Sequence, residues 1–315
     1  MMINRATRRR FLRQAGAGTL AWAAASHLDL AIPGTLPNSV GYSIISWPPK
    51  DILPALDAIA GLGYSGVQLL GWVQEAYAGD KIPDIKNRIQ ELKLFATALS
   101  CSNVRLSPDS PENFTKRFRD YADFLHVLGG SVLQLIDAGK PHGNYSATEV
   151  KSLGAKMNEM GRIAKDSGMT VGYHPHFNTF GETREGLGRV LDATDPRYVG
   201  LIVDVAHLKL GGSDPAEVIR TYHQRLVMVH LKDVRRDAYE LVRQNRDDAG
   251  KLKVRFCEIG TGVVEFPAVV ASLKAARFQG WAIVELDSYL PSAGGPAESA
   301  KVNTDALRSM GFRIG

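Results

Sequence analysis

Short apolar runs of strand length recur along most of the chain. They are rich in Val, Ile and Leu and are apolar on both faces, which is typical of parallel strands that are buried on both sides. Eight such runs occur: Val40–Ile45, Gly66–Leu70, Ser102–Leu106, Val132–Ile136, Thr170–Tyr173, Gly200–Val203, Val227–Leu231 and Ala282–Val284.

Amphipathic segments of helical period separate these runs. The clearest spans Asp84–Leu99, and the apolar side of this expected helix consists of Ile85, Ile89, Leu92 and Phe95. Segments Thr183–Thr194 and Glu265–Arg277 show the same pattern. Eight strands alternating with eight helices predict an α/β fold with a single (β/α)8 TIM barrel. A doubly wound open sheet is the alternative, but Ser46–Asp51 lacks the glycine-rich phosphate turn that such a sheet would place after its first strand.

The first residues follow a different pattern. Thr7–Arg13 contains consecutive arginines followed by Phe11 and Leu12, and a weakly apolar Ala- and Gly-rich stretch comes next. This stretch is too short and too mild to be a stable membrane anchor, and the order is typical of a cleaved export signal. The paired arginines resemble the twin-arginine type, with a basic amphipathic helix as the alternative.

We therefore expect residues 1–31 to be a twin-arginine-type signal peptide with a short lead-in, cleaved between Ala23 and Ala31. Residues 32–315 are expected to form the barrel. The twin-arginine export machinery would be a partner, and the mature protein would be periplasmic or otherwise exported.

The positive net charge of the chain comes from the expected signal segment. The whole chain has 38 Lys+Arg and 33 Asp+Glu, a net charge of +5. Five of the bases lie in residues 1–25, which contain no acid, so the rest of the chain is neutral overall. Nucleic-acid binding requires a surplus of Lys and Arg to neutralise phosphates, and we expect no nucleic-acid partner. The two cysteines, Cys101 and Cys257, do not form a CxxC pair; we expect two buried thiols, with a single bridge as the alternative.

Candidate chemistry stands at the carboxyl ends of the last four strands, the end where barrel enzymes place their active sites. A buried carboxylate is costly unless it is paired or coordinated, although each residue alone could be a helix cap or a packing histidine. Because barrel strands converge, these side chains should meet and form an N/O site for a divalent metal. They are His174 and His176 after the fifth strand, Asp204 and His207 at the sixth, His230 in the seventh and Glu285 in the eighth.

Five segments, YHPHF, LIVDVAHL, VHLKDV, EIGTGVVEF and GWAIVELD, resemble the xylose-isomerase-like barrels in order and spacing. This family includes sugar isomerases and epimerases, sugar phosphate isomerases and inosose dehydratase, and the resemblance covers about Val40 to Gly311. It implies one divalent ion, most often manganese, with zinc or cobalt also compatible. The ligands carry over as a strand-five histidine, with His176 slightly favoured over His174, together with Asp204, His230 and Glu285.

Two departures from the family's commonest pattern remove carboxylates. Histidine replaces the strand-five glutamate, and Gln68 stands where strand two often ends in glutamate, so a two-glutamate proton shuttle is in doubt. Glu258, just before Gly260-Thr261-Gly262, could compensate, or it could be an ordinary loop acid. The candidate catalytic residues are Glu285, Glu258 and His174, and the candidate substrate-binding residues are His207, Lys232 and Gln68.

The resemblance implies a metal-dependent isomerase or epimerase acting on a keto sugar or related polyol through an enediolate. The alternative is a dehydratase or lyase acting on a 3-keto glycoside or inosose at the same site. An exported sugar-binding protein without catalysis is a third interpretation, and a DNA-repair endonuclease is disfavoured by the neutral charge. We expect an unphosphorylated carbohydrate as the small-molecule substrate, because sugar phosphates stay in the cytoplasm. The sequence leaves the oligomeric state open.

Overall fold

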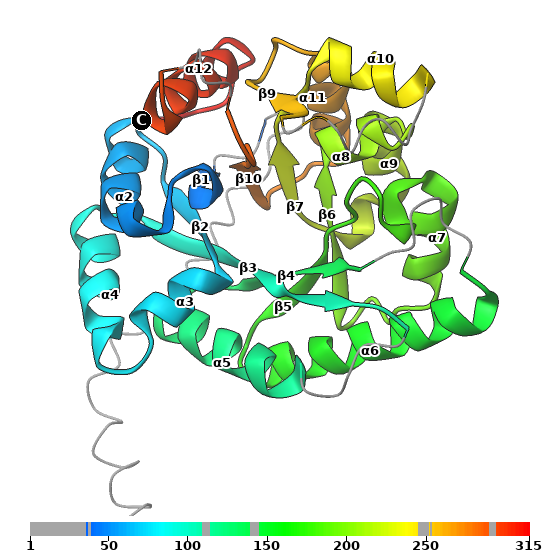
Figure 1. Ribbon diagram of the computed structural model, residues 1–315, viewed down its shortest axis with the longest axis horizontal. Helices are drawn as coiled ribbons and strands as arrows, with labels where there is room; N and C mark the ends of the chain where they lie inside the picture. Colours follow the sequence, from blue (N-terminus) through cyan, green and yellow to red (C-terminus); the bar gives the residue numbers. More distant parts are fainter. Residues whose placement is uncertain are drawn as a thin grey trace, which may run out of the picture.

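Eight parallel strands close into a barrel with helices around it (Figure 1). The computed structural model describes residues 36, 39–108, 114–138, 145–244, 252, 254–289 and 294–315. The order of the barrel strands is β1-β10-β7-β6-β5-β4-β3-β2, and all of their pairings are parallel. The predicted (β/α)8 barrel is confirmed, whereas the predicted signal peptide, residues 1–31, lies outside the described residues.

The barrel strands lie close to the predicted apolar runs, except for the third. Their bounds are β1 Val40–Ser43, β2 Gly66–Leu70, β3 Phe95–Leu106, β4 Val132–Asp137, β5 Thr170–Tyr173, β6 Val199–Asp204, β7 Leu226–Leu231 and β10 Trp281–Val284. A short antiparallel pair, β8 (Asp233–Val234) with β9 (Phe256–Cys257), follows the carboxyl end of β7.

Helices cover the outside of the barrel, and α7 and α11 fall inside two of the predicted segments. The bounds are α2 Ile52–Gly61, α3 Gly71–Tyr77, α4 Ile82–Glu91, α5 Phe114–Val127, α6 Ala147–Asp166, α7 Arg184–Asp192, α8 Val205–Leu210, α9 Pro215–Tyr222, α10 Arg236–Gln244, α11 Phe266–Ala275 and α12 Pro296–Ser309. Within the described part of the chain, no helix is both long and apolar enough to cross a membrane.

The predicted helix Asp84–Leu99 is too long. The helix α4 ends at Glu91, and Lys93 adopts a left-handed conformation (φ 56°) that reverses the chain. The Leu94 N–H donates to the carbonyl of Ile89, which is the bond of a Schellman ending with lysine where glycine is usual. Phe95 is therefore the first residue of β3, not part of the helical face, and β3 begins seven residues before the predicted start at Ser102.

The interior of the barrel is filled by a layer of apolar side chains from five strands. This cluster consists of Ala98, Val132, Ile202, Met228 and Ile283, from β3, β4, β6, β7 and β10. At β5 the layer has Gly172, where a Cβ would lie 2.5 Å from Cγ1 of Ile202, so the missing side chain makes room for its neighbour. The layer closes the barrel beneath its carboxyl ends, the ends to which the site residues belong.

Candidate functional site

A polar layer lies directly above this apolar layer. Side chains two residues apart on a strand point to the same side, so each strand that fills the core presents its next inward residue one step closer to its carboxyl end. These inward residues are Gln68 of β2, Gln134 of β4, His174 just after β5, Asp204 of β6, His230 of β7 and Glu285 just after β10. All six are buried, so the alternation of the strands gathers polar side chains in one enclosed space.

Four of these residues form a cluster with the geometry of a metal site. His174, Asp204, His230 and Glu285 each offer one ligand atom, and the four atoms lie within 4.8 Å of one another. Nε2 of His174 lies 3.3 Å from Oδ2 of Asp204, and Nδ1 of His230 lies 3.2 Å from Oε1 of Glu285. Nδ1 of His230 is buried without a hydrogen bond to any described group. Two imidazole nitrogens and two carboxylate oxygens suit Mn²⁺, Zn²⁺ or Co²⁺.

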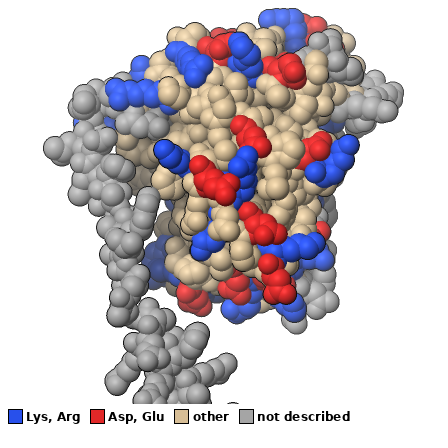
Figure 2. Space-filling view, turned by 90° about the vertical axis from the view of Figure 1, so that its left-hand side faces the viewer, with Lys and Arg blue, Asp and Glu red and all other residues tan. Residues whose placement is uncertain are grey.

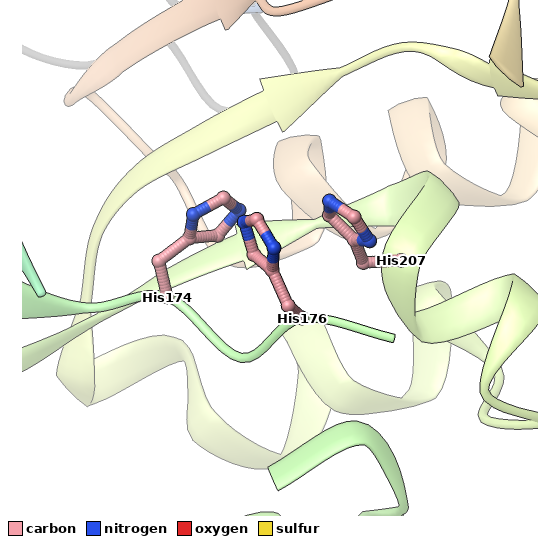
Figure 3. Close-up of side chains that lie close together, drawn as sticks. All are labelled: His174, His176 and His207. Atoms are coloured by element: carbon pink, nitrogen blue, oxygen red, sulfur yellow. The ribbon is translucent and has the colours of Figure 1, made fainter. Parts of the chain in front are cut away.

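The two histidines around Pro175 take different places in the site. His174 continues the alternation of β5, points to Asp204 and belongs to the four-residue cluster. It also belongs to a second group of possible metal ligands with His176 and His207, and His176, beyond the proline, belongs to that second group alone. Figure 3 shows the His176 ring between those of His174 and His207. The sequence favoured His176 slightly as the ligand; the geometry puts His174 beside the other three donors.

Two glutamines form hydrogen bonds to residues of the cluster. The amide oxygen of Gln68 accepts from Nε2 of His230 at 2.8 Å, and its amide nitrogen donates to Glu285 and, at 3.0 Å, to Oε1 of Gln134. Gln134 in turn lies 2.6 Å from Nδ1 of His174, measured from its Nε2. Gln68 was predicted to bind substrate, but it is fully buried and contacts two residues of the cluster. Gln134 was not predicted, although it is the one polar residue inside the apolar run Val132–Ile136.

Lys232 brings the only buried ammonium among the described residues into this site. Its Nζ lies 3.0 Å from Oδ2 of Asp204 and 2.7 Å from Oδ2 of Asp287, a residue that the sequence did not single out. Burial lowers the pKa of Lys232, but the neighbouring carboxylates outweigh burial and raise it, so the ammonium stays charged. Burial alone would raise the pKa of Asp204, yet Lys232 and the histidines hold it well below its usual value.

Asp204 also forms the start of helix α8. Its Oδ1 accepts from the backbone N–H groups of Ala206 and His207, both at 2.9 Å, which is the usual arrangement of an aspartate N-cap. Oδ2 is left for the cluster. The helix that carries His207 is therefore anchored to a residue of the cluster.

His176 and His207 form a stacked pair beside the cluster. Their ring centroids lie 3.9 Å apart with 20° between the planes, and the backbone N–H of Phe177 donates to Nδ1 of His207 at 3.2 Å. Nε2 of each ring is buried and has no hydrogen-bond partner among the described residues. Burial lowers the pKa of both histidines well below the usual value, so both rings are neutral at pH 7.

Asp137, at the end of β4, fixes the loop that carries His176. Its carboxylate accepts from the hydroxyl of Tyr173 at 2.9 Å and from the N–H of Phe180 at 2.8 Å. Burial raises the pKa of Asp137. Asp137 was not among the predicted site residues, although it closes an apolar strand as Asp204 does.

Glu258 lies outside the cluster. Its Oε1 accepts from the Ser299 hydroxyl at 2.7 Å, and it lines a surface hollow with Arg235, Cys257 and Thr261. Asp233 fixes this loop by accepting from four backbone N–H groups: Val234, Gly260, Gly262 and Val264. The structure therefore does not bring Glu258 together with Glu285. Cys101 and Cys257 are free and buried, as predicted.

Surface charge is mixed where it can be followed in Figure 2. On that face, the left-hand side of Figure 1, basic and acidic side chains are interspersed, and no single-sign patch covers it. Helices α2 and α4, which lie on the left of Figure 1, are joined by an ion pair between Asp57 and Arg88. Such a face does not offer the continuous basic surface that nucleic-acid binding uses.

The sequence profile of the xylose isomerase-like TIM barrel family matches residues 56–310. The chain belongs to this family. Two inosose dehydratases are similar to this family member. The protein from Clostridium tetani (strain Massachusetts / E88) is 29% identical over 291 residues, covering 83% of this chain and 93% of that protein. The protein from Geobacillus kaustophilus (strain HTA426) is 29% identical over 295 residues, covering 84% of this chain and 92% of that protein.

Two solved structures share the fold. The IolI protein, in a crystal structure with a bound zinc atom, has a TM-score of 0.69 and 16% identity, covering 86% of this chain and 96% of that one. The 3-keto-D-glucoside 4-epimerase from E. coli has a TM-score of 0.65 and 17% identity, covering 86% and 98%. The two relatives are dehydratases and the last of these structures is an epimerase, so this chain is a member of an enzyme family.

Proposed function

We propose that this protein is a divalent-metal-dependent dehydratase that removes water from an unphosphorylated keto polyol of the inosose type. The observation that carries the proposal is the buried cluster of His174, Asp204, His230 and Glu285, with Nδ1 of His230 left without a hydrogen bond to any described group. The similarity to inosose dehydratases supports dehydration over the other reactions that such a cluster could perform.

The donor set fits one divalent ion. Asp204 and Glu285 are charged, and His230 turns its Nδ1 toward both carboxylates, 3.2 Å from Oε1 of Glu285, while Gln68 accepts from its Nε2. A ligating histidine usually donates its other ring N–H in this way. When bound, the ion would polarise a carbonyl and an adjacent hydroxyl of the substrate and favour loss of the neighbouring proton. Manganese, zinc and cobalt all suit these ligands.

The residues around the cluster would handle the protons. A base takes the proton from the carbon beside the carbonyl and passes it to the hydroxyl on the next carbon, which leaves as water. A carbon–carbon double bond forms without oxidation or reduction. Glu285 is bound into the cluster, because Oε2 accepts from Gln68 and Oε1 lies against His230. We therefore favour His176 as the base, since its Nε2 is buried and has no partner among the described residues.

The isomerase or epimerase interpretation shares the first proton transfer and differs in the second. Returning the proton to the opposite face requires a second acid, and the inward residue of β2 is the amide of Gln68 rather than a carboxylate. Glu258, the other candidate, is bonded to Ser299 away from the cluster. These contacts support elimination over epimerisation.

The test is product analysis by NMR after incubating the metal-loaded protein with an inosose, a 3-keto glycoside and free or phosphorylated keto sugars. We expect loss of water from an unphosphorylated substrate. An epimer or an aldose–ketose pair as the sole product would establish the alternative, and a marked preference for phosphorylated sugars would contradict the proposed substrate class.

Two substitutions separate the base from the cluster. His176→Gln should keep the metal but lose solvent-deuterium exchange at the carbon beside the carbonyl, with a rate at least about a hundredfold lower. Glu285→Gln should lose both metal and exchange. Undiminished exchange in His176→Gln would contradict the role of His176 and leave Glu285 as the base.

A further inference from the structure

We infer that Asp233 acts as an internal anion: its carboxylate fills an anion cradle in the loop after β7, excludes phosphate from it and holds the β8–β9 hairpin against the site. The anion cradle consists of the backbone N–H groups of Val234, Gly260, Gly262 and Val264. The cradle does not depend on the proposed reaction, whereas its effect on turnover rests on the proposed function.

Both oxygens of the Asp233 carboxylate are satisfied by the anion cradle. Oδ1 accepts from the N–H of Val234 at 2.7 Å and from that of Val264 at 2.8 Å. Oδ2 accepts from Gly260 at 3.1 Å and from Gly262 at 2.9 Å. The residue is 1% exposed, so these bonds are closed to water. Backbone N–H groups that converge in this way form anion-binding sites, including sites for phosphate.

The loop backbone is shaped around an anion. Gly260 adopts a left-handed conformation (φ 83°), which glycine reaches without strain. At Gly262 a Cβ would lie 2.5 Å from Oδ1 of Asp233, so the missing side chain lets this N–H approach the carboxylate. Barrel enzymes frequently bind phosphate with loops after strands seven and eight, and this loop follows the seventh barrel strand, β7. Here the chain supplies the anion itself, and a phosphate cannot enter while Asp233 is in place.

The β8–β9 hairpin links the anion cradle to the site. Asp233 begins β8, and the next residue of β8 pairs with Phe256 of β9. Phe256 is buried, and Nζ of Lys232 lies 4.6 Å from the centroid of its ring. The same Nζ lies 3.0 Å from Oδ2 of Asp204 in the cluster. A loop without its anion would release the hairpin and uncover this ammonium, so Asp233 is a positioning residue that acts through Phe256.

Anion rescue tests the cradle in the whole protein. Asp233→Ala opens the space of the carboxylate, and formate has the size to fill it. We expect this variant to melt below the parent, and formate to restore its melting temperature in a saturable manner, relative to the same concentration of chloride. Thr261→Val is the matched control, because it removes a hydrogen bond to the Glu258 carbonyl in the same loop and leaves the cradle filled. An equal response to formate in Asp233→Ala, Thr261→Val and the parent would overturn the inference.

Two further measurements complete this test. Inorganic phosphate should stabilise Asp233→Ala and not the parent; rescue by formate without any effect of phosphate would overturn the exclusion of phosphate. Asp233→Asn serves if the alanine variant does not fold. Its amide fills the space but turns an NH₂ group toward N–H donors, so we expect a lower melting temperature that formate does not restore. A melting temperature equal to that of the parent would refute the need for an anion.

Cys257 reports on the hairpin without any substrate. It pairs with Asp233 and is buried, and burial raises the pKa of its thiol to about 11, so it should react slowly with a disulfide reagent in the parent. In a Cys101→Ala background it is the one thiol of the chain. We expect Asp233→Ala to speed its labelling at least about tenfold, since the bonds that hold the hairpin are lost, and formate to slow it again. Unchanged labelling in folded Asp233→Ala would overturn the link between the cradle and the hairpin.

Turnover then tests the positioning role. Metal-loaded Asp233→Ala should retain the ion, because the Asp233 carboxylate is bonded to the loop and not to the cluster. We expect its kcat on an inosose to fall about ten- to a hundredfold, the size of effect of a misplacement of about 1 Å, and formate to restore it. Phe256→Leu should show a similar fall that formate does not restore. A parental kcat in Asp233→Ala without formate would refute the positioning role. If no substrate of the inosose type reacts while the formate and Cys257 results stand, the proposed function fails and the cradle does not.

Discussion

Gln68 offers a measurable test of how the ligand residues are held. It bonds to His230 and to Glu285, and its fully buried side chain can be replaced by leucine with little change in volume. Each of the two bonds should contribute about 1 kcal/mol net. Their joint loss, about 2 kcal/mol, corresponds to roughly thirty-fold weaker metal binding, since 1.4 kcal/mol is tenfold. Removing residues that orient metal ligands generally weakens binding by about ten- to a hundredfold.

Gln134→Leu provides the graded comparison. Gln134 contacts one residue of the cluster, His174, so its loss should cost about 1 kcal/mol, or roughly fivefold in affinity. Thr97→Val is the matched control. Thr97 is buried and donates to the Val67 carbonyl, so this change also removes one buried hydrogen bond, but among the described residues no hydrogen bond or ion pair joins Thr97 to the cluster.

The assay is competition for Mn²⁺ or Zn²⁺ against a coloured chelator. Thermal melts of the metal-free variants show whether each remains folded. We expect affinity to fall in the order parent and Thr97→Val together, then Gln134→Leu, then Gln68→Leu. Unchanged affinity in folded Gln68→Leu, or a larger loss in Gln134→Leu, would refute the inference that these amides orient the ligands.

Two further predictions concern the ion and the start of the chain. Elemental analysis should find about one divalent ion per chain, and Asp204→Ala or His230→Ala should lose it. A chelator should lower the melting temperature of the parent because the ion binds the folded state. Full activity in metal-free protein would contradict the site. Changing Arg8 and Arg9 together to Lys should trap unprocessed precursor inside the cell, as measured by immunoblotting of cell fractions. Normal export and processing of this variant would exclude the twin-arginine type.

The barrel was predictable because parallel strands that are buried on both faces consist of continuous apolar runs, and these can be recognised in the sequence. The one large error came where two periods overlap. Ile85, Ile89, Leu92 and Phe95 satisfy a helical period, and nothing in the letters marks Lys93 as the residue that ends the helix, since glycine is the usual one there. A short apolar run cannot be divided between helix and strand by periodicity alone.

The site was predictable as a set of residue types, and less so as an arrangement. Strand ends identified Asp204, His230 and Glu285 because polar residues there interrupt apolar runs. The choice between His174 and His176 depends on the course of the chain through Pro175, which residue types do not encode. Gln134 and Asp137 were not predicted, although β4 carries the same signal: one polar residue interrupts its apolar run and another closes it.

Asp204 belongs both to the cluster and to the start of α8, and this shared use fixes the distance between them. One of its oxygens faces the cluster and the other holds the first turn of α8, so the distance from the cluster to the His207 ring is fixed by three residues of backbone. Because both sets of contacts use the Asp204 side chain, the cluster and the start of α8 are held at a set distance from each other. Under the proposed function, a substrate would be selected by the separation of its oxygens as well as by their chemistry. Cyclic polyols keep that separation nearly constant, whereas open-chain sugars must first adopt it.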